Sequence, residues 1–196
     1  MAEAALEDDW PRTVEEFEAW HARQPDRWEF IGGRPCLMAP GSKPHTIIKA
    51  NAFRALDRAF EGTSCHVFAD GGQILNDEIS AIPDAVVSCG PLDLSTPVVA
   101  EPTIIVEVMS PWSESDDTQR KWFSYRKIPS LRHYLVVAQD RREVLIHSRA
   151  GELWRERFVS EGAIELDDPP LAIELAALNL ATDLEAQGTR QQRGRS

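Results

Sequence analysis

The chain of 196 residues has few cysteines, fewer basic than acidic residues, and no long hydrophobic run. No apolar run approaches the roughly 20 residues that a membrane-spanning helix needs. The first ten residues, MAEAALEDDW, are acidic and have no apolar core, so we expect no secretory signal there. The sequence also contains no P-loop, no G-x-G-x-x-G and no G-x-S-x-G motif. These absences argue against a membrane protein, a nucleotide-binding enzyme of the common types and a serine hydrolase.

The three cysteines, Cys36, Cys65 and Cys89, are far apart in the sequence and form no C-x-x-C pair. Such spacing argues against a structural zinc site, and the odd number favours reduced thiols and therefore a cytoplasmic location. The five histidines show no H-E-x-x-H or comparable metal-binding spacing. The cysteines and histidines therefore point to no metal site.

The formal net charge is -11, with 21 Lys and Arg against 32 Asp and Glu. A DNA-binding surface is usually basic, because neutralising phosphates supplies much of the affinity, so this charge argues against unspecific binding of nucleic acid. The charge is uneven, however: residues 120–149 contain eight Lys or Arg and only two acids. This basic segment is either a solvated helix and hairpin or a surface that faces a substrate.

The length suits one domain with a sizeable core. We expect an acidic arm over residues 1–12, a single domain over residues 13–185 and a flexible basic tail over residues 186–196. No internal repeat interrupts this arrangement.

Local patterns predict the elements in the first half of the domain. Thr13 and Glu16 form a capping box that predicts a helix from Val14 to about Gln24. Gly32-Gly33 predicts a β-hairpin, and apolar periodicity predicts a longer helix that follows it. The predicted spans are strands over 28–31 and 34–39, a helix over 44–60, and strands over 65–69 and 73–75.

Two short apolar runs in the middle of the chain each carry one acid. Asp84 lies in the run 83–87 and Glu107 in the run 103–109, and both runs are rich in β-branched residues. Both are therefore predicted to be buried strands. A carboxylate in such a strand is costly unless it is paired or binds a metal, although a single acid could also cap a helix or pair with an Arg.

A helix is predicted over residues 113–127, after the second acidic strand. Asp117, Lys121 and Tyr125 are four residues apart and lie on one face of it. The Asp117/Lys121 spacing alone is more typical of a surface ion pair than of a catalytic element. A hairpin over 131–137 and 143–147, strands over 151–159 and 164–166, and a short helical turn within 171–180 complete the expected domain.

Several segments together resemble one family, over roughly Thr13 to Leu180. They are P-D at 83–84, E-V-M-S-P at 107–111, D-x-x-x-K-x-x-x-Y at 117–125, W-E-F-I-G-G-R at 28–34, and M-A-P-G at 38–41 followed by His45. This set resembles the Uma-two family, a bacterial branch of the PD-(D/E)XK nuclease superfamily. The resemblance implies an α/β fold with a restriction-endonuclease-like mixed β-sheet flanked by α-helices. It also implies a divalent-metal-dependent endonuclease that hydrolyses phosphodiester bonds of DNA.

The resemblance assigns roles to particular residues. Asp84 and Glu107 would be catalytic and would bind Mg²⁺, with Mn²⁺ as a substitute and the carbonyl of Val108 as a third ligand. The E-x-K triplet of the superfamily reads Glu107-Val108-Met109 here, so Met109 stands where the Lys usually is. Lys121 matches the position from which the family supplies a Lys instead. We expect its replacement by Ala to abolish most cleavage and to leave metal binding and the melting temperature nearly unchanged.

Three further residues are auxiliary candidates, and each has a structural alternative. Glu29 would lie near the metal site or face solvent from a strand. His45 would lie near the opening of the site, or would be a surface residue or a capping partner at a helix start. Tyr125 would hold Lys121 in place or would be a core aromatic. The resemblance also suggests a homodimer with DNA as its substrate.

Two other readings compete with the endonuclease. One is a nuclease-fold protein that has lost catalysis and serves as a binding or regulatory module, which Met109 and the acidic net charge support. The other is an unrelated α/β hydrolase or interaction domain, which requires Asp84 and Glu107 to lie far apart in space.

Overall fold

The computed structural model describes residues 10–38, 40–109 and 116–184 of the chain. The expected basic tail, most of the expected acidic arm and the last two residues of the E-V-M-S-P motif, Ser110 and Pro111, lie outside the described residues. The side chain of Asp117 lies outside them too, so its expected pairing with Lys121 stays a prediction. The domain limits at residues 13 and 185 also stay predictions.

A six-stranded sheet in the order β10-β9-β8-β7-β6-β3 forms the centre of the molecule. Strands β7 and β8 are parallel, and the other neighbours are antiparallel. The helix α3 connects the two parallel strands, as the expected mixed sheet requires. The strands of this sheet are β3 (His66–Ala69), β6 (Ala85–Ser88), β7 (Pro102–Met109), β8 (His133–Ala138), β9 (Val144–Ala150) and β10 (Leu153–Val159).

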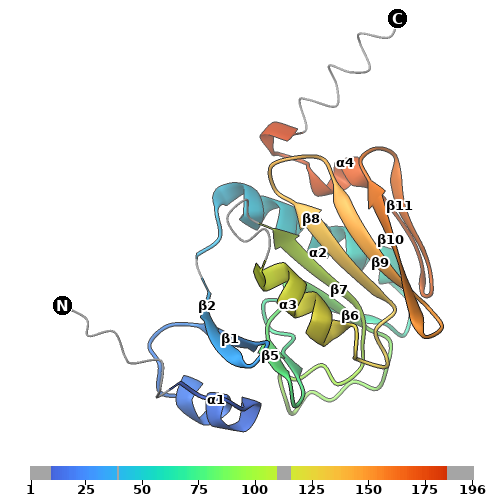
Figure 1. Ribbon diagram of the computed structural model, residues 1–196. Helices are drawn as coiled ribbons and strands as arrows, with labels where there is room; N and C mark the ends of the chain where they lie inside the picture. Colours follow the sequence, from blue (N-terminus) through green and yellow to red (C-terminus); the bar gives the residue numbers. More distant parts are fainter. Residues whose placement is uncertain (1–9, 39, 110–115, 185–196) are drawn as a thin grey trace, which may run out of the picture.

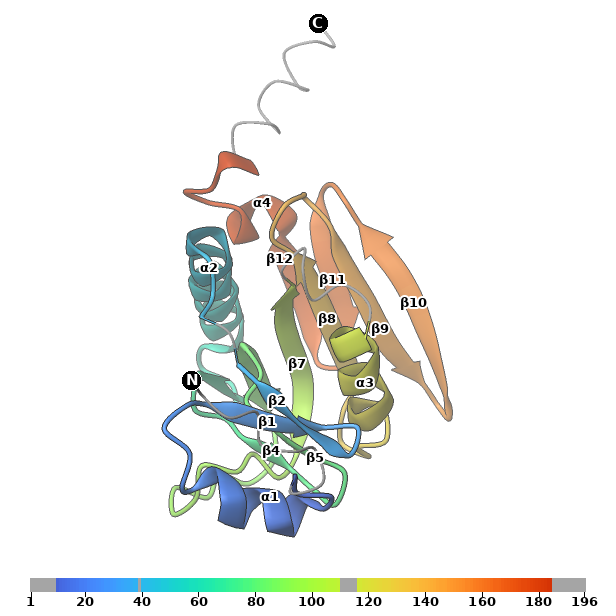
Figure 2. The same cartoon turned by 60° about the vertical axis from the view of Figure 1, so that its left-hand side comes forward.

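Helices cover the two faces of this sheet (Figures 1 and 2). The helix α2 (Lys43–Phe60) packs on one face, and α3 (Asp116–Tyr125) packs on the other. Ser42 caps α2 by accepting a hydrogen bond from the backbone N–H of His45. The helix buries Ile48, Leu56 and Phe60 at helical spacing, as its periodicity predicted.

Alternation along β7 divides the core into two parts. Ile104, Val106 and Val108 point into the cluster that contains α2, whereas Ile105 points into the cluster that contains Tyr125 of α3. Successive side chains of a strand point to opposite faces, so Glu107 faces the same side as Ile105. The sequence of β7 therefore directs one acid toward α3 and the apolar residues beside it toward α2.

Smaller elements complete the fold. A four-stranded sheet in the order β2-β1-β5-β4 packs beside α3, with the helix α1 (Val14–His21) against it. Its hairpin turns at Gly32 and Gly33, which have positive φ as predicted. The remaining elements are β1 (Trp28–Ile31), β2 (Arg34–Leu37), β4 (Ile74–Leu75), β5 (Ile79–Ala81), the hairpin of β11 (Ala163–Asp167) with β12 (Pro170–Glu174), and α4 (Leu175–Leu178).

Three of these elements correct the sequence prediction. The first helix ends at His21, whereas it was expected to reach about Gln24. The strand β5 was not predicted, because its three residues carry little periodicity and pair with β1, almost 50 positions earlier in the chain. The strand β12 was expected to be loop and helical turn, yet it pairs with β11 over five residues. No helix within the described residues is both long and apolar enough to cross a membrane.

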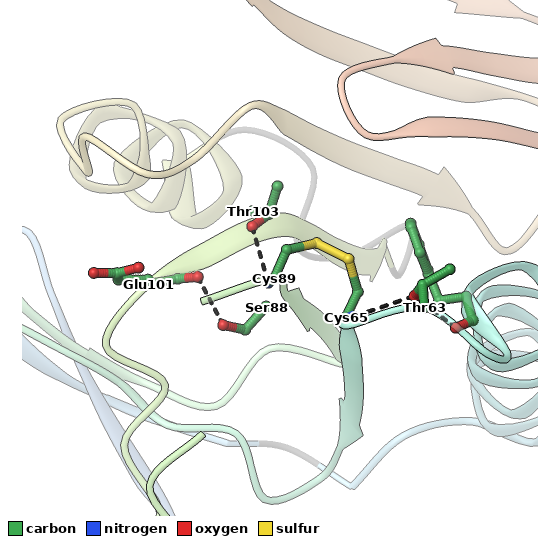
Figure 3. Close-up of a disulfide and its surroundings, with 7 residues drawn as sticks. Thr63, Cys65, Ser88, Cys89, Glu101 and Thr103 are labelled. Carbon is green, nitrogen blue, oxygen red and sulfur yellow. Dashed lines mark hydrogen bonds between the residues drawn. A yellow bond between two sulfur atoms is a disulfide. The ribbon is translucent and has the colours of Figure 1, made fainter. Parts of the chain in front are cut away.

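The expectation of three reduced cysteines is wrong for two of them. Cys65 and Cys89 form a disulfide (Figure 3), with their Cα atoms 4.0 Å apart, and Cys36 is not part of it. Cys65 directly precedes β3 and Cys89 directly follows β6. His66 pairs with Ser88 across these antiparallel strands, so the two cysteines lie opposite each other. The pairing of β3 with β6 could not be read from the sequence, so the two cysteines appeared distant. The disulfide removes the argument from cysteine usage for a cytoplasmic location, which stays a prediction.

We expect the disulfide to stabilise the fold, because it closes a loop between residues that are 24 positions apart. Replacing Cys65 by Ala should lower the free energy of unfolding by about 3 kcal/mol, measured by urea denaturation. A reducing agent should lower the stability of the parent protein to the same level. Cys36→Ala is the matched control and should leave the response to the reducing agent unchanged. A parent protein whose unfolding midpoint is the same with and without reductant would contradict this expectation.

Candidate active site

The strand ladder brings Asp84 and Glu107 together. Ala85 pairs with Val106 across the antiparallel strands β6 and β7, so Asp84 and Glu107 stand opposite each other, one residue beyond that pair. The backbone N–H of Val108 donates to Asp84 Oδ2 at 2.7 Å and fixes the carboxylate beside β7. Glu107 lies on β7, as predicted, whereas Asp84, which was predicted to lie within a strand, lies directly before β6. The two acids lie close together, so the reading that required them to lie far apart is wrong.

Glu107 receives two donors from α3. Lys121 Nζ lies 3.0 Å from Glu107 Oε1, and the Tyr125 hydroxyl donates to the same oxygen at 3.2 Å. Lys121 and Tyr125 are one helical turn apart on α3, so both side chains reach the same carboxylate. Tyr125 is also fully buried, with its ring edge-on to Tyr134. The reading of Tyr125 as a core aromatic is therefore correct, whereas its hydroxyl contacts Glu107, so the expectation that it holds Lys121 in place stays a prediction.

Lys121 is a buried residue and does not belong to a surface ion pair. It is 8% exposed, and its amine contacts Glu29 Oε2 at 3.0 Å as well as Glu107. Glu29 lies on β1, is 4% exposed, and accepts a hydrogen bond from the backbone N–H of Ile82. The reading of Glu29 as a solvent-facing strand residue is therefore wrong. Two buried acids share one buried amine, which ties β1, β7 and α3 together at this point.

His45 and Lys49 reach Asp84 from the N-terminal half of α2. His45 Nε2 lies 3.3 Å from Asp84 Oδ2, and Lys49 Nζ lies 3.2 Å from Asp84 Oδ1. His45 and Lys49 are four residues apart and therefore share a helix face. His45 thus contacts Asp84 through its side chain, and its backbone N–H is also the capping partner of Ser42. Its expected position near the opening of the site stays a prediction.

Lys49 and its second partner, Asp70, were not predicted as members of the site. Lys49 Nζ lies 2.5 Å from Asp70 Oδ1, and Asp70 adopts a left-handed backbone conformation with φ 55° just after β3. Helical periodicity placed Lys49 beside the core face of α2. The position of Asp70 near Asp84 follows only from the pairing of β3 with β6. The Asp-Gly-Gly sequence at 70–72 was a signal for a special backbone conformation, and it did not indicate an ion pair.

Burial and neighbouring charges shift the pKa values of the acids in opposite directions. Burial raises the pKa of Glu107 to about 8, against the opposing effect of Lys121, and the nearby Asp84 and Glu29 raise it further. Burial also raises the pKa of Asp84, but the hydrogen bonds from His45 and Val108 and the charges of His45 and Lys49 outweigh it, so the pKa is lowered. The hydrogen bond to Asp84 raises the pKa of His45 in spite of burial. The site therefore contains one readily ionised carboxylate beside one that is costly to ionise.

Several basic side chains of residues 120–149 have partners within the protein. Lys127 pairs with Glu78, and Arg132 with Asp168. Arg149 donates to the backbone carbonyls of Arg126, Ile128 and Leu131. The contacts of Arg141 with Asp140 and Glu143 complete this set. Because Lys127, Arg132 and Arg141 remain largely exposed in these pairs, the contacts favour the reading of residues 120–149 as a solvated helix and hairpin.

The donor atoms of the site fit a hard divalent cation. Mg²⁺ prefers oxygen ligands and is usually held by one or two carboxylates while it keeps several waters. Asp84 and Glu107 supply two carboxylates, and the side-chain contacts that Glu107 makes with Lys121 and Tyr125 fall on Oε1. No group of three His, Cys, Asp or Glu side chains placed for a metal occurs in the described part of the chain. The protein would therefore hold the cation through few side chains, and solvent or substrate oxygens would supply the rest.

Comparisons with known proteins agree with this geometry. The model of the Uma-two family, described as "Putative restriction endonuclease", matches residues 14–185. The chain belongs to the Uma-two family. Two uncharacterised proteins of Synechocystis sp. are relatives of this family member. One is 30% identical over 138 residues, which is 69% of this chain and 73% of the relative, and the other is 26% identical over 145 residues, which is 71% and 82%.

A solved structure shares the fold of this Uma-two protein. It is described as "a putative nuclease belonging to DUF820 from Anabaena variabilis", and it superposes with a TM-score of 0.70 at 14% sequence identity. The similarity covers 86% of this chain and 97% of that chain. At this identity the comparison shows the fold alone, and it confirms the expected nuclease-like α/β architecture. A homodimer stays a prediction.

Proposed function

We propose that this protein is a divalent-metal-dependent endonuclease that hydrolyses phosphodiester bonds of DNA. The observation that carries the proposal is the contact of the buried Lys121 amine with Glu107. Asp84 lies beside Glu107, because the residues next to them, Ala85 and Val106, pair across β6 and β7. Two adjacent acids and a fixed amine are the groups that metal-assisted phosphodiester hydrolysis requires. Membership in a family described as restriction endonucleases supports the same activity.

The two acids would hold the cation between them. Asp84 and Glu107 would each give a carboxylate oxygen, and the carbonyl of Val108 would be the third protein ligand. Mg²⁺ is the proposed cation, with Mn²⁺ as a substitute. When bound, the cation would lower the pKa of a water molecule and offset the charge that develops on the phosphate. Burial is the main cause that raises the pKa of Glu107 to about 8, and the nearby acids Asp84 and Glu29 add to it. A bound cation would offset the charge of these neighbouring acids and favour the ionised form of Glu107.

The other side chains would position groups and donate hydrogen bonds. Lys121 would donate to the attacking water or to the phosphate oxygen in the transition state. Glu29 would hold the amine in place through its 3.0 Å contact, and the Tyr125 hydroxyl would orient the carboxylate of Glu107. Donors fixed before the reaction lower the barrier because they do not have to reorganise as charge develops.

Met109 was the main reason to consider a protein that has lost catalysis. The amine of Lys121 reaches Glu107 from α3, so a Lys at position 109 is not needed to bring an amine to this acid. This contact supports the catalytic reading over the inactive one.

The test is cleavage of supercoiled plasmid DNA by the full chain. We expect nicked and linear products with Mg²⁺ or Mn²⁺ and none after addition of EDTA. Asp84→Asn, purified in the same way, controls for a contaminating nuclease and should give no product. Cleavage that persists at the same rate in EDTA or in Asp84→Asn would contradict the proposal.

A further inference from the structure

Three acids lie side by side at one end of the central sheet, with Asp70 directly after β3, Asp84 directly before β6 and Glu107 on β7. The pair Ala69–Ala85 places Asp70 next to Asp84 across β3 and β6, as the pair Ala85–Val106 places Asp84 next to Glu107. Like charges that face each other across strands destabilise a sheet. A cation is therefore needed between Asp70 and Asp84 as well as between Asp84 and Glu107.

Lys49 supplies the first of these cations. Its amine lies 2.5 Å from Asp70 Oδ1 and 3.2 Å from Asp84 Oδ1, and its side chain is 19% exposed. The other oxygen of Asp84, Oδ2, accepts a hydrogen bond from the backbone N–H of Val108 and contacts His45. Because Val108 donates from the backbone of β7, its hydrogen bond cannot be released without disturbing the strand. Oδ1 is thus the oxygen of Asp84 that a bound cation would use. The Lys49 amine contacts the same oxygen in the metal-free protein.

An ammonium group and a divalent cation that contact the same carboxylate oxygen repel each other and therefore compete for it. A cation such as Mg²⁺ binds oxygen at about 2.0–2.1 Å, and at that position it would repel an amine that contacts the same oxygen. Lys49 has an alternative partner within reach, because Asp70 already contacts it and is 59% exposed at its side chain. The exposed carboxylate of Asp70 could keep the amine after Asp84 has released it.

We propose that Lys49 is the counterion of Asp84 in the metal-free protein and that it moves to Asp70 alone when Asp84 binds a divalent cation. This inference rests on the proposed function, because it concerns the same metal site. Lys49 competes with the cation, and Asp70 favours the cation by drawing Lys49 away. The two residues therefore tune metal affinity in opposite directions, although both lie outside the proposed ligand set.

The test measures Mn²⁺ affinity directly, from the electron paramagnetic resonance signal of free Mn²⁺ in a titration of the full chain without DNA. Lys49→Met should bind Mn²⁺ about tenfold more tightly, and Asp70→Asn about tenfold more weakly, the range found for residues that contact metal ligands. Lys49→Gln, which retains a polar group without the charge, should behave as Lys49→Met does. Circular dichroism checks that each variant is folded.

A double variant distinguishes the proposed transfer of Lys49 from Asp84 to Asp70 from a general effect of charge on metal affinity. If Asp70 acts through Lys49, Asp70→Asn should have no further effect in a Lys49→Met background, whereas two independent field effects would add. Lys43→Met removes an exposed Lys from the first residue of the same helix and should leave the affinity nearly unchanged. An effect of Lys49→Met no larger than that of Lys43→Met, or additive effects in the double variant, would overturn the inference.

Asp84→Asn distinguishes failure of this inference from failure of the proposed function. If Asp84→Asn binds Mn²⁺ as tightly as the parent protein, the cation does not use Asp84, and both proposals fail. If Asp84→Asn loses the binding while Lys49→Met and Asp70→Asn leave it unchanged, the metal site stands and only the proposed transfer of Lys49 is wrong.

Discussion

Replacing Glu107 by Gln is expected to reduce metal-dependent cleavage of DNA by about 1000-fold or more, because a metal ligand supplies several kcal/mol of transition-state stabilisation. The isosteric amide keeps the shape of the side chain and can still accept the hydrogen bonds from Lys121 and Tyr125. The loss would therefore reflect the charge and not a change in packing. The measurement is the initial rate of plasmid nicking at saturating Mg²⁺.

Metal-linked stability gives a second measurement for Glu107→Gln. A ligand present at 100 times its dissociation constant stabilises the native state by about 2.7 kcal/mol, so Mn²⁺ should raise the melting temperature of the parent protein. The variant should lose most of this increase. Its metal-free stability should not fall greatly, because burial makes ionisation of Glu107 costly and raises its pKa to about 8. Glu78→Gln, which removes an exposed acid paired with Lys127, is the matched control and should retain the full response to metal.

An unchanged increase in melting temperature with Mn²⁺ in Glu107→Gln would place the cation elsewhere. An unchanged cleavage rate in the same variant would exclude Glu107 from the reaction. Either result would contradict the role assigned to this residue, even if the plasmid is cleaved by the parent protein.

The acidic strands could be predicted from the sequence because the signal is local. Asp84 and Glu107 interrupt apolar, β-branched runs, and a buried carboxylate in such a run requires a partner wherever the strand lies in the fold. The hairpin at Gly32-Gly33 and the periodicity of α2 are local signals of the same kind, and both predictions were confirmed. The mixed sheet was expected from the family resemblance, and the order of its strands was not predicted, since no local pattern specifies it.

The remaining members of the site depend on contacts between distant segments. Lys49 and Asp70 are 21 positions apart and meet because β3 pairs with β6, which the sequence did not indicate. The same pairing brings Cys65 to Cys89. An edge strand of four residues has too little pattern to be placed in a sheet by periodicity. The ion pair and the disulfide were therefore missed for the same reason.

The burial of Lys121 changes the prediction that its replacement leaves the fold intact. A surface lysine can be removed at a cost of about 0–1 kcal/mol, whereas breaking a buried ion pair by removing one partner costs about 3–5 kcal/mol. Without the amine, Glu29 and Glu107 would remain buried without their shared cation. The expectation of a nearly unchanged melting temperature in Lys121→Ala does not agree with these contacts.

Replacing Lys121 by Met is therefore expected to lower both stability and activity. The free energy of unfolding should fall by about 3–5 kcal/mol in urea denaturation. The cleavage rate of the protein that remains folded should fall by about 100-fold to 1000-fold, the effect of removing one donor to the transition state. Combining the change with Glu29→Gln should recover part of the stability, because only Glu107 then lacks its cation. It should recover none of the activity, since the donor is still absent.

Met109→Lys in the Lys121→Met background tests whether an amine supplied from β7 can replace the one that α3 supplies. Met109 is two residues after Glu107 on β7, so its side chain lies on the same face of the sheet and packs in the cluster that contains Tyr125. A lysine there would restore the E-x-K spacing of the superfamily and return a cation to Glu107. We expect partial recovery of both the cleavage rate and the stability. If the folded Lys121→Met protein cleaves as fast as the parent, Lys121 has a structural role only, and Lys49 becomes the next candidate donor because its amine lies 3.2 Å from Asp84.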